Sequence, residues 1–425
     1  MPKPNVTLPS WDAIPSDIGA ATLSVKAALR ASIEANGRSA AEVVSEIEEF
    51  IASEMADIQA TRARGEEVWP VVKFADIASS EVSDETRALI HRRGCVVVKN
   101  NFDQTTARGW DHNIVHYVES NRFFENYRGP GDDFFGTVGS KPEIYPIYWS
   151  PAQMEARQHP NMAATQSFLN RLWNFNDGKT QWFDPNHNLA YPDRIRRRPP
   201  GTNSNGLGTH LDPGTLDLWM SSGYQKAFAS LFAGDFAAHD PWSAAHRVDA
   251  AQYPGTTMCS AFRTFQGWTA LSDMRRDQGV LHTIPIPKAF AYLLLRPLLD
   301  DVADDDLCGV QISRTFPVNE RFHSLLTPAL SGIPDVEPGD TVWWHCDLIH
   351  GVAPVVDQQG WGNVMYIPAA PWCAKNATYA DLVRESFFAG NSANDFPDEH
   401  YEATWPNRFT TDQLTALGRA GLGIS

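Results

Sequence analysis

The stretch PGDTVWWHCDLIHGV, residues 338–352, gives the most specific indication of the fold. Its opening Pro-Gly-Asp predicts a turn, residues 341–344 predict a strand, and His345 and His350 follow that strand. Similar runs occupy residues 259–273, 279–286 and 363–370, each separated from the next by Gly, Pro or Asp. Several short strands with turn signals between them indicate a β sandwich or barrel in the second half of the chain.

The first half of the chain has a different, helical pattern. SAAE at residues 39–42 matches a capping box, and apolar residues follow it at helical spacing. DETRALIHRR, residues 84–93, predicts a second helix, and GCVVVKNNF after it predicts a buried strand. Residues 150–175 also read as helical, with an interruption at Pro160. We expect this helical material to pack around the β core.

Composition excludes several classes of partner. The net charge is −16, from 51 acidic and 35 basic residues, which disfavours nucleic acid and anionic membrane surfaces. The five cysteines are scattered and odd in number, so we expect no disulfide framework and a reducing compartment. Neither a signal peptide nor an apolar run of membrane-spanning length is recognisable. These features together predict a cytoplasmic protein.

The segment GTHLDPGTLDLWM, residues 208–220, contains a candidate pair of metal ligands. His210 and Asp212 are two residues apart, so on an extended chain their side chains point to the same side. The alternative is an ordinary loop, in which the imidazole bonds a neighbour and the carboxylate caps a turn. One distant histidine would complete two imidazoles and a carboxylate, a set that leaves Fe(II) open positions for a keto acid and O₂. Zinc also accepts such ligands, but the HExxH helix of zinc proteases is missing from the sequence.

Four segments, taken together, resemble a known family: FRTFQGWTALSD, GVLHTIPIP, PGDTVWWHCDLIHGV and WGNVMYIPAAPWC. With the helix before GCVVVKN, they resemble a group of bacterial and fungal proteins catalogued as a domain of unknown function. That group is similar to the phytanoyl-CoA dioxygenase branch of the Fe(II)/2-oxoglutarate-dependent oxygenases. The resemblance covers about residues 35–410.

The resemblance implies a fold and a ligand set. The fold would be mainly β with added helices, around a double-stranded β-helix core of the jelly-roll or cupin-like type. Residues 1–90 would form a helical extension packed on this core, and residues 91–425 the oxygenase domain with helical insertions. The catalytic metal ligands would be His210, Asp212 and His350. His350 is preferred to His345 because the family's ligand stands immediately before a small residue, here Gly351.

The chain departs from the family pattern at the site for the co-substrate. Many relatives carry an arginine on the strand after the distal histidine, where it binds the far carboxylate of 2-oxoglutarate, but residues 360–364 contain no cation. We predict that Arg263 replaces it, close to Thr264, Gln266 and Trp268, although a regular strand would place these three on the opposite face. Two other candidates are Arg296, expected in a helical context, and the basic run 194–198, expected to be a solvated loop.

The sequence thus predicts an oxidoreductase, an Fe(II)/2-oxoglutarate-dependent dioxygenase that acts on an unactivated C–H bond. Hydroxylation is the expected outcome, with desaturation or cyclisation as variants. The partners would be O₂ and a small-molecule substrate such as a small carboxylic or amino acid, and neither nucleic acid nor membrane. One alternative is a cupin-type iron oxygenase without 2-oxoglutarate, which the missing arginine favours. A second is a metal-free β-barrel that binds a ligand without turnover.

Overall fold

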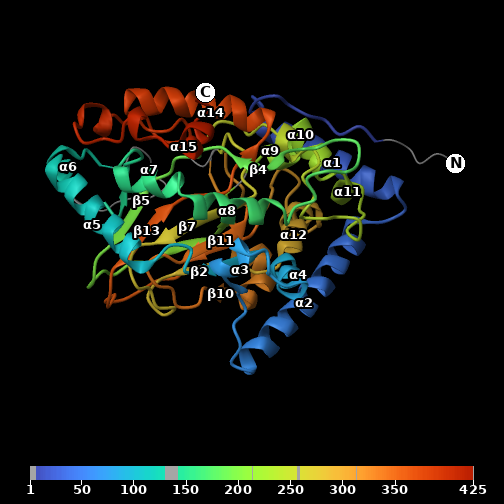
Figure 1. Cartoon of the computed structure of the whole chain (residues 1–425). Coiled ribbons are helices and arrows are strands. Elements are labelled where there is room, and N and C mark those ends of the chain that lie inside the picture. The colour runs from blue at the N-terminus through green and yellow to red at the C-terminus, as the bar shows by residue number, and fades with distance from the viewer. Residues whose placement is uncertain (1–5, 130–141, 213, 256–258, 313, 425) are drawn as a thin grey trace.

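The computed structural model describes residues 6–129, 142–212, 214–255, 259–312 and 314–424. In this part of the chain, two large β-sheets are surrounded by helices, as Figure 1 shows. The protein is therefore a mixed α/β protein, richer in helix than the predicted mainly β class, because most of the first half is helical. Within the same residues, no helix is both long and apolar enough to cross a membrane.

The larger sheet has seven strands, and all neighbours in it are antiparallel except the first pair. In spatial order these strands are β1 (Val71–Lys73), β2 (Cys95–Lys99), β11 (Thr341–His345), β7 (Phe265–Ala270), β13 (Gly362–Tyr366), β5 (Ile195–Arg198) and β3 (Ile144–Tyr145). The predicted strands within residues 94–102, 259–273, 338–352 and 363–370 are confirmed. Strand β1 was not anticipated; it lies within the predicted N-terminal extension but pairs with β2.

The smaller sheet has five strands and carries both candidate histidine ligands. In spatial order it contains β10 (Ser331–Gly332), β8 (Leu281–Thr283), β12 (His350–Val352), β6 (Leu207–Leu211) and β9 (Phe316–Pro317). A separate pair joins β14 (Pro371–Trp372) to β4 (Asp184–Asn188). The antiparallel pairing of β6 with β12 places His210 opposite His350, so residues 140 positions apart become neighbours.

Side-chain alternation on the strands separates two cores. Trp344 and Val364 of the larger sheet and Leu281 of the smaller one belong to the same buried cluster, which lies between the two sheets. Trp343 and Met365 point to the opposite face and pack with residues of the helices that cover it. Successive side chains of a strand point to opposite faces, so a sheet covered on both sides buries consecutive apolar residues in two different cores.

Fifteen α-helices occur in the described residues, most of them short. They are α1 (Ile18–Ala35), α2 (Ala40–Ala63), α3 (Phe74–Ala78), α4 (Asp84–Arg93), α5 (Gln104–Ser120), α6 (Phe123–Asn126), α7 (Pro151–Arg157), α8 (Pro160–Asn170), α9 (Asp217–Met220), α10 (Ser222–Ala227), α11 (Ala229–Phe232), α12 (Phe290–Leu295), α13 (Glu320–His323), α14 (Ala374–Ala389) and α15 (Ala416–Gly421). The predicted capping box is confirmed, since Ser39 and Glu42 exchange side-chain and backbone bonds at the start of α2. The predicted interruption at Pro160 is also confirmed as the start of α8.

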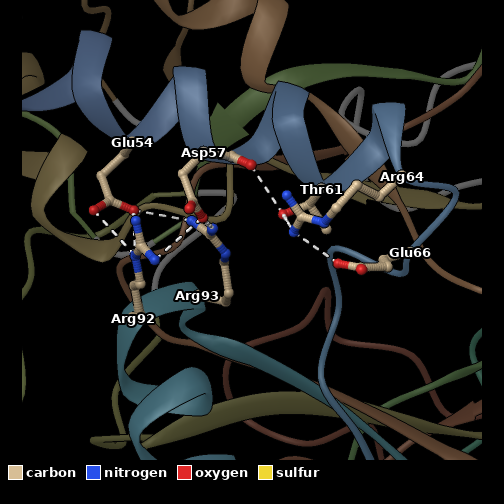
Figure 2. Close-up of polar contacts among 7 residues, drawn as sticks. All are labelled: Glu54, Asp57, Thr61, Arg64, Glu66, Arg92 and Arg93. Carbon is tan, nitrogen blue, oxygen red and sulfur yellow. Dashed lines mark hydrogen bonds and ion pairs between the residues drawn. The ribbon is translucent and has the colours of Figure 1, made fainter.

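An ion-pair network fastens α2 to α4 (Figure 2). The Arg93 side chain is only 2% exposed; one Nη donates to Glu54 at 2.9 Å, and the other contacts Asp57. Arg92 also pairs with Glu54 at 2.9 Å, but its side chain is 43% exposed. Because a buried guanidinium requires carboxylate partners, Arg93 fixes the position of α2 on the sheet that α4 leads into.

The basic run at residues 194–198 is not a solvated loop, so that expectation was wrong. Residues 195–198 form the buried strand β5 between β13 and β3. The run tolerates burial because its guanidinium groups have distinct surroundings. Arg197 pairs with Asp111 on one face, whereas Arg198 on the other donates to the carbonyl oxygens of Gln278 and Gly279. All five cysteines are buried and unpaired.

Candidate metal centre and active site

The side chains of His210, Asp212 and His350 converge at one end of the smaller sheet. Each offers a ligand atom, and these atoms lie within 4.8 Å of one another. The Nε2 atom of His210 is 3.1 Å from Oδ1 of Asp212, and the Nε2 atom of His350 is 3.7 Å from its Oδ2. Both Nε2 atoms therefore face the same carboxylate, which is the arrangement a metal ion needs on one side of its coordination shell.

Backbone carbonyls orient the two imidazoles. The Nδ1 atom of His210 is 2.6 Å from the Gly208 oxygen, and the Nδ1 atom of His350 is 2.9 Å from the Leu348 oxygen. A carbonyl oxygen can only accept, so each Nδ1 carries the proton and donates it. In the neutral form of each ring the lone pair is then on Nε2, as metal-binding histidines require.

The small residue after the second histidine has a steric cause. A Cβ at Gly351 would lie 2.7 Å from the Leu207 oxygen and 2.8 Å from Nε2 of His282. Strand β12 is flanked by β6 and β8, and the backbone of β6 comes too close to allow a side chain. Glycine thus lets His350 sit directly opposite His210.

Charge interactions make the three groups ready for a cation. Burial alone would raise the pKa of Asp212, but His350 and His210 outweigh it and hold that pKa well below its usual range, with a further contribution from Arg263. Burial lowers the pKa of His350 to about 4. Burial also acts to lower the pKa of His210, but the hydrogen bond to Asp212 prevails and raises it. At neutral pH the carboxylate is therefore ionised and His350 is neutral.

His345 does not join this group. It is fully buried, its ring stacks on Trp173 with centroids 4.5 Å apart, and its Nε2 is 3.0 Å from the Pro241 oxygen. Its Nδ1 accepts from the backbone N–H of Asp347. Both ring nitrogens are thus bonded within the protein, and Asp347 itself is paired with Arg247. A second cluster of possible ligands, His345, Cys346 and Asp347, is accordingly a structural one.

A cavity of about 160 Å³ opens beside the three candidate ligands. Its walls come from both sheets and from the segments that connect their strands. The lining residues are Ile144, Tyr191, Asp193, Arg194, Arg196, Leu207, His210, Asp212, Arg263, Gln266, Gly267, Trp268, Leu281, Trp344, His350, Val352, Tyr366, Pro368, Asp395 and Phe396. Such a mixture of aromatic walls and a few convergent polar groups is typical of a small-molecule site.

The residues predicted for the co-substrate separate into two groups. Arg263, Gln266 and Trp268 line the cavity, so the chain is irregular just before β7 and brings Arg263 to the same side as the other two. Thr264 points elsewhere: its hydroxyl is fully buried and donates to Asn170. Arg296 follows α12, in the helical context expected, and pairs with Asp301 away from the cavity.

Arg196 belongs to the basic run that the sequence analysis offered as a candidate but expected to be a solvated loop, so its place in the cavity was not predicted. It is buried on β5, lies opposite Val364 of β13, and lines the cavity. Among the described residues, no hydrogen bond or ion pair engages the guanidinium group of Arg196. Because three of the residues 195–198 are arginines, this strand shows no alternation of apolar and polar residues in the sequence. Only its pairing with β13 and β3 shows that the Arg196 side chain faces the cavity. The distant segments that supply Tyr191 and Asp395 carry no recognisable motif.

Comparisons with known proteins agree on one family. The sequence profile of the Gig2-like family matches residues 20–424. The "Uncharacterized protein YbiU" of Escherichia coli (strain K12) is 54% identical over 416 residues, which are 97% of this chain and 98% of that protein. A crystal structure of the hypothetical protein JW0805 from Escherichia coli has 51% identity and a TM-score of 0.91, covering 98% of this chain and all of that one. GlcNAc Inducible Gene 2 of Candida albicans has 24% identity and a TM-score of 0.77, covering 98% and 90%, and shares the fold.

Proposed function

Taking as premise that this chain belongs to the Gig2-like family, we propose that it is an Fe(II)/2-oxoglutarate-dependent oxygenase acting on a small molecule. The observation that carries the proposal is the convergence of His210, Asp212 and His350 beside a cavity lined by two arginines that have no ion pair within the described residues. The two facing sheets are proposed to be a double-stranded β-helix of the phytanoyl-CoA dioxygenase type, with residues 1–90 as an extension of the catalytic unit 91–425.

The donor set fits iron on chemical grounds. Two imidazoles whose Nε2 atoms face one ionised carboxylate are the ligand types of non-haem Fe(II) oxygenases. Because these ligands come from one end of the smaller sheet, the opposite side of a bound ion would face the cavity. Iron bound there would supply the activation of O₂, while the protein supplies binding, orientation and exclusion of water.

The co-substrate needs a cation for its far carboxylate, since a buried unpaired charge is very costly. Arg263 was predicted to provide it and remains a candidate because it lines the cavity. We assign the role to Arg196 instead. Val364 belongs to the strand where relatives carry their arginine, and Arg196 is its direct cross-strand neighbour on β5. The guanidinium group thus comes from the adjacent strand, with the bidentate geometry that suits a carboxylate.

The proposed reaction divides the two atoms of O₂ between the co-substrate and the substrate. 2-Oxoglutarate loses CO₂ and takes one oxygen atom from O₂ to become succinate, and the substrate C–H bond receives the other atom as a hydroxyl group. The chain's own contribution is to hold the co-substrate between the metal ligands and Arg196 and to keep the substrate against the aromatic wall formed by Trp268 and Trp344.

Substrate-dependent formation of succinate tests this proposal. Purified protein with Fe(II), 2-oxoglutarate and a panel of small carboxylic and amino acids should produce succinate in step with O₂ uptake. Asp212→Ala should abolish the reaction, whereas Thr209→Ala, next to His210 on β6 but outside the cavity lining, should retain it. O₂ uptake without 2-oxoglutarate would favour the cupin-type oxygenase, and no iron dependence would favour a non-catalytic ligand-binding barrel.

A further inference from the structure

Apart from Arg194, which pairs with Asp193, the cavity is lined by two arginines, one more than the co-substrate needs. Arg196 and Arg263 both line it, and among the described residues neither guanidinium group has a hydrogen bond or an ion pair. Arg263 instead lies over the Tyr191 ring, with Cζ 4.9 Å from the centroid. A ring face attracts a cation but leaves its N–H groups unused. The guanidinium group of Arg263 can therefore still bind an anion.

The two arginines lie at different depths relative to the metal ligands. Arg263 precedes β7, and the first residue of β7, Phe265, pairs with His345 at the ligand end of the larger sheet. Arg263 is also one of the charges that act on Asp212 and His350. It therefore lies on the metal side of the cavity.

Arg196, on β5, lies further from the metal ligands than Arg263 does. Arg198 contacts the Gly279 oxygen, whereas His350 pairs with Thr283, four residues further along that segment. At about 3.3 Å per residue this places Arg198 roughly 13 Å from the ligand level. Arg196, two residues before Arg198 on the same face, is intermediate. A keto acid chelated to the metal would extend inward towards Arg196, leaving Arg263 for another molecule.

An acidic group accompanies Arg263. Asp395 also lines the cavity; its Oδ2 accepts from the Tyr191 hydroxyl and from the Ser260 N–H, each within 2.9 Å. Its Oδ1 is buried and has no hydrogen-bond partner among the described residues. A buried carboxylate oxygen without a donor is unfavourable, so a ligand that brings an N–H group would satisfy it.

The charges of the cavity point to a substrate with no net charge. Arg194 and Asp193 form a pair at 3.6 Å. The remaining arginines, Arg196 and Arg263, balance Asp212 and Asp395. A divalent metal would then be balanced by the doubly negative co-substrate. A substrate that carries one positive and one negative group leaves the buried site neutral, whereas a simple carboxylate would not.

On the basis of the proposed function, we propose that the substrate is a small zwitterionic amino acid whose carboxylate binds Arg263 and whose ammonium group binds Asp395. Arg196 alone then holds the far carboxylate of 2-oxoglutarate. The aromatic and aliphatic walls, among them Trp268, Leu281 and Phe396, would surround the side chain of this amino acid.

Calorimetric titration of 2-oxoglutarate into anaerobic Fe(II)-loaded protein tests whether Arg196, and not Arg263, binds the co-substrate. Arg196→Gln should weaken 2-oxoglutarate binding roughly 10- to 100-fold, the loss expected for hydrogen bonds to a charged group. Arg263→Gln should leave it within about twofold. Arg197→Gln is the matched control, because it lies on β5 but faces Asp111 outside the cavity. A large loss of 2-oxoglutarate affinity in Arg263→Gln would overturn this inference but not the proposed function. If the wild type does not bind 2-oxoglutarate, both are overturned.

Titration of the twenty common amino acids into the same iron- and 2-oxoglutarate-loaded protein tests the substrate class. At least one should bind, and its amide and its N-acetyl derivative should each bind at least about tenfold more weakly. Arg263→Gln should remove the preference over the amide, and Asp395→Asn the preference over the N-acetyl form. Binding of none of the twenty, or equal binding of the three forms, would overturn the inference.

Discussion

Replacing Arg93 should destabilise the protein much more than replacing its neighbour Arg92. Arg93→Met keeps most of the apolar stem but removes a guanidinium group that is 2% exposed and bonded to two carboxylates (Figure 2). Glu54, only 13% exposed, would lose its buried partner and keep only the exposed Arg92, which it shares with Asp57. Removal of one partner of a buried pair costs about 3–5 kcal/mol, and the partial exposure of Asp57 places the expected loss near about 3 kcal/mol.

Arg92→Met is the control for that change. Its side chain is 43% exposed, and an exposed pair with Glu54 contributes only about 0.2–1 kcal/mol. Urea unfolding of the two variants, followed by circular dichroism, should give clearly different midpoints. If the free energies of unfolding of the two variants differ by less than about 1 kcal/mol, the network does not anchor α2 as described.

Three further outcomes follow from the site and the sheet. The metal affinity should fall as pH drops through the raised pKa of His210, because its proton must leave before metal binds, whereas His350 stays neutral down to about pH 4. Competition titrations at a pH between these two pKa values should therefore show one proton released, and two would contradict this. His345→Ala should cost about 3 kcal/mol in unfolding experiments yet retain the metal, whereas loss of metal with normal folding would make it a ligand. Gly267→Ala should cost about 1–3 kcal/mol, because its Cβ would lie 2.4 Å from the Trp343 ring; an unchanged melting temperature would refute that packing.

Much of the β core was predictable because its strands are apolar runs bounded by turn residues. Residues 94–102 and 338–352 show this most clearly: the first forms β2, and the second forms β11 and β12, which belong to different sheets. Strand β5 could not be predicted in this way. Its arginines are charged, and they are buried only because β13, β3 and the cavity give each side chain separate surroundings.

The site residues that are close together in the sequence could be predicted, whereas those that come from distant segments could not. His210 on β6 and Asp212 just beyond its end are two residues apart, and His350 follows a recognisable strand, so their types and spacing were informative. Arg196 and Asp395 reach the same cavity from segments 199 residues apart, and only the packing of the whole chain brings them together. No pattern in the neighbouring sequence indicates that Arg196 and Asp395 share a cavity.

Visible absorption of the anaerobic complex tests the central claim most directly. A keto acid chelated to Fe(II) gives a charge-transfer band that needs both molecules on the same metal. The wild type and Arg197→Gln should show the band only when Fe(II) and 2-oxoglutarate are both present, and His350→Ala should not show it. A band that persists in His350→Ala, or its absence from the iron-loaded wild type with saturating 2-oxoglutarate, would contradict the account.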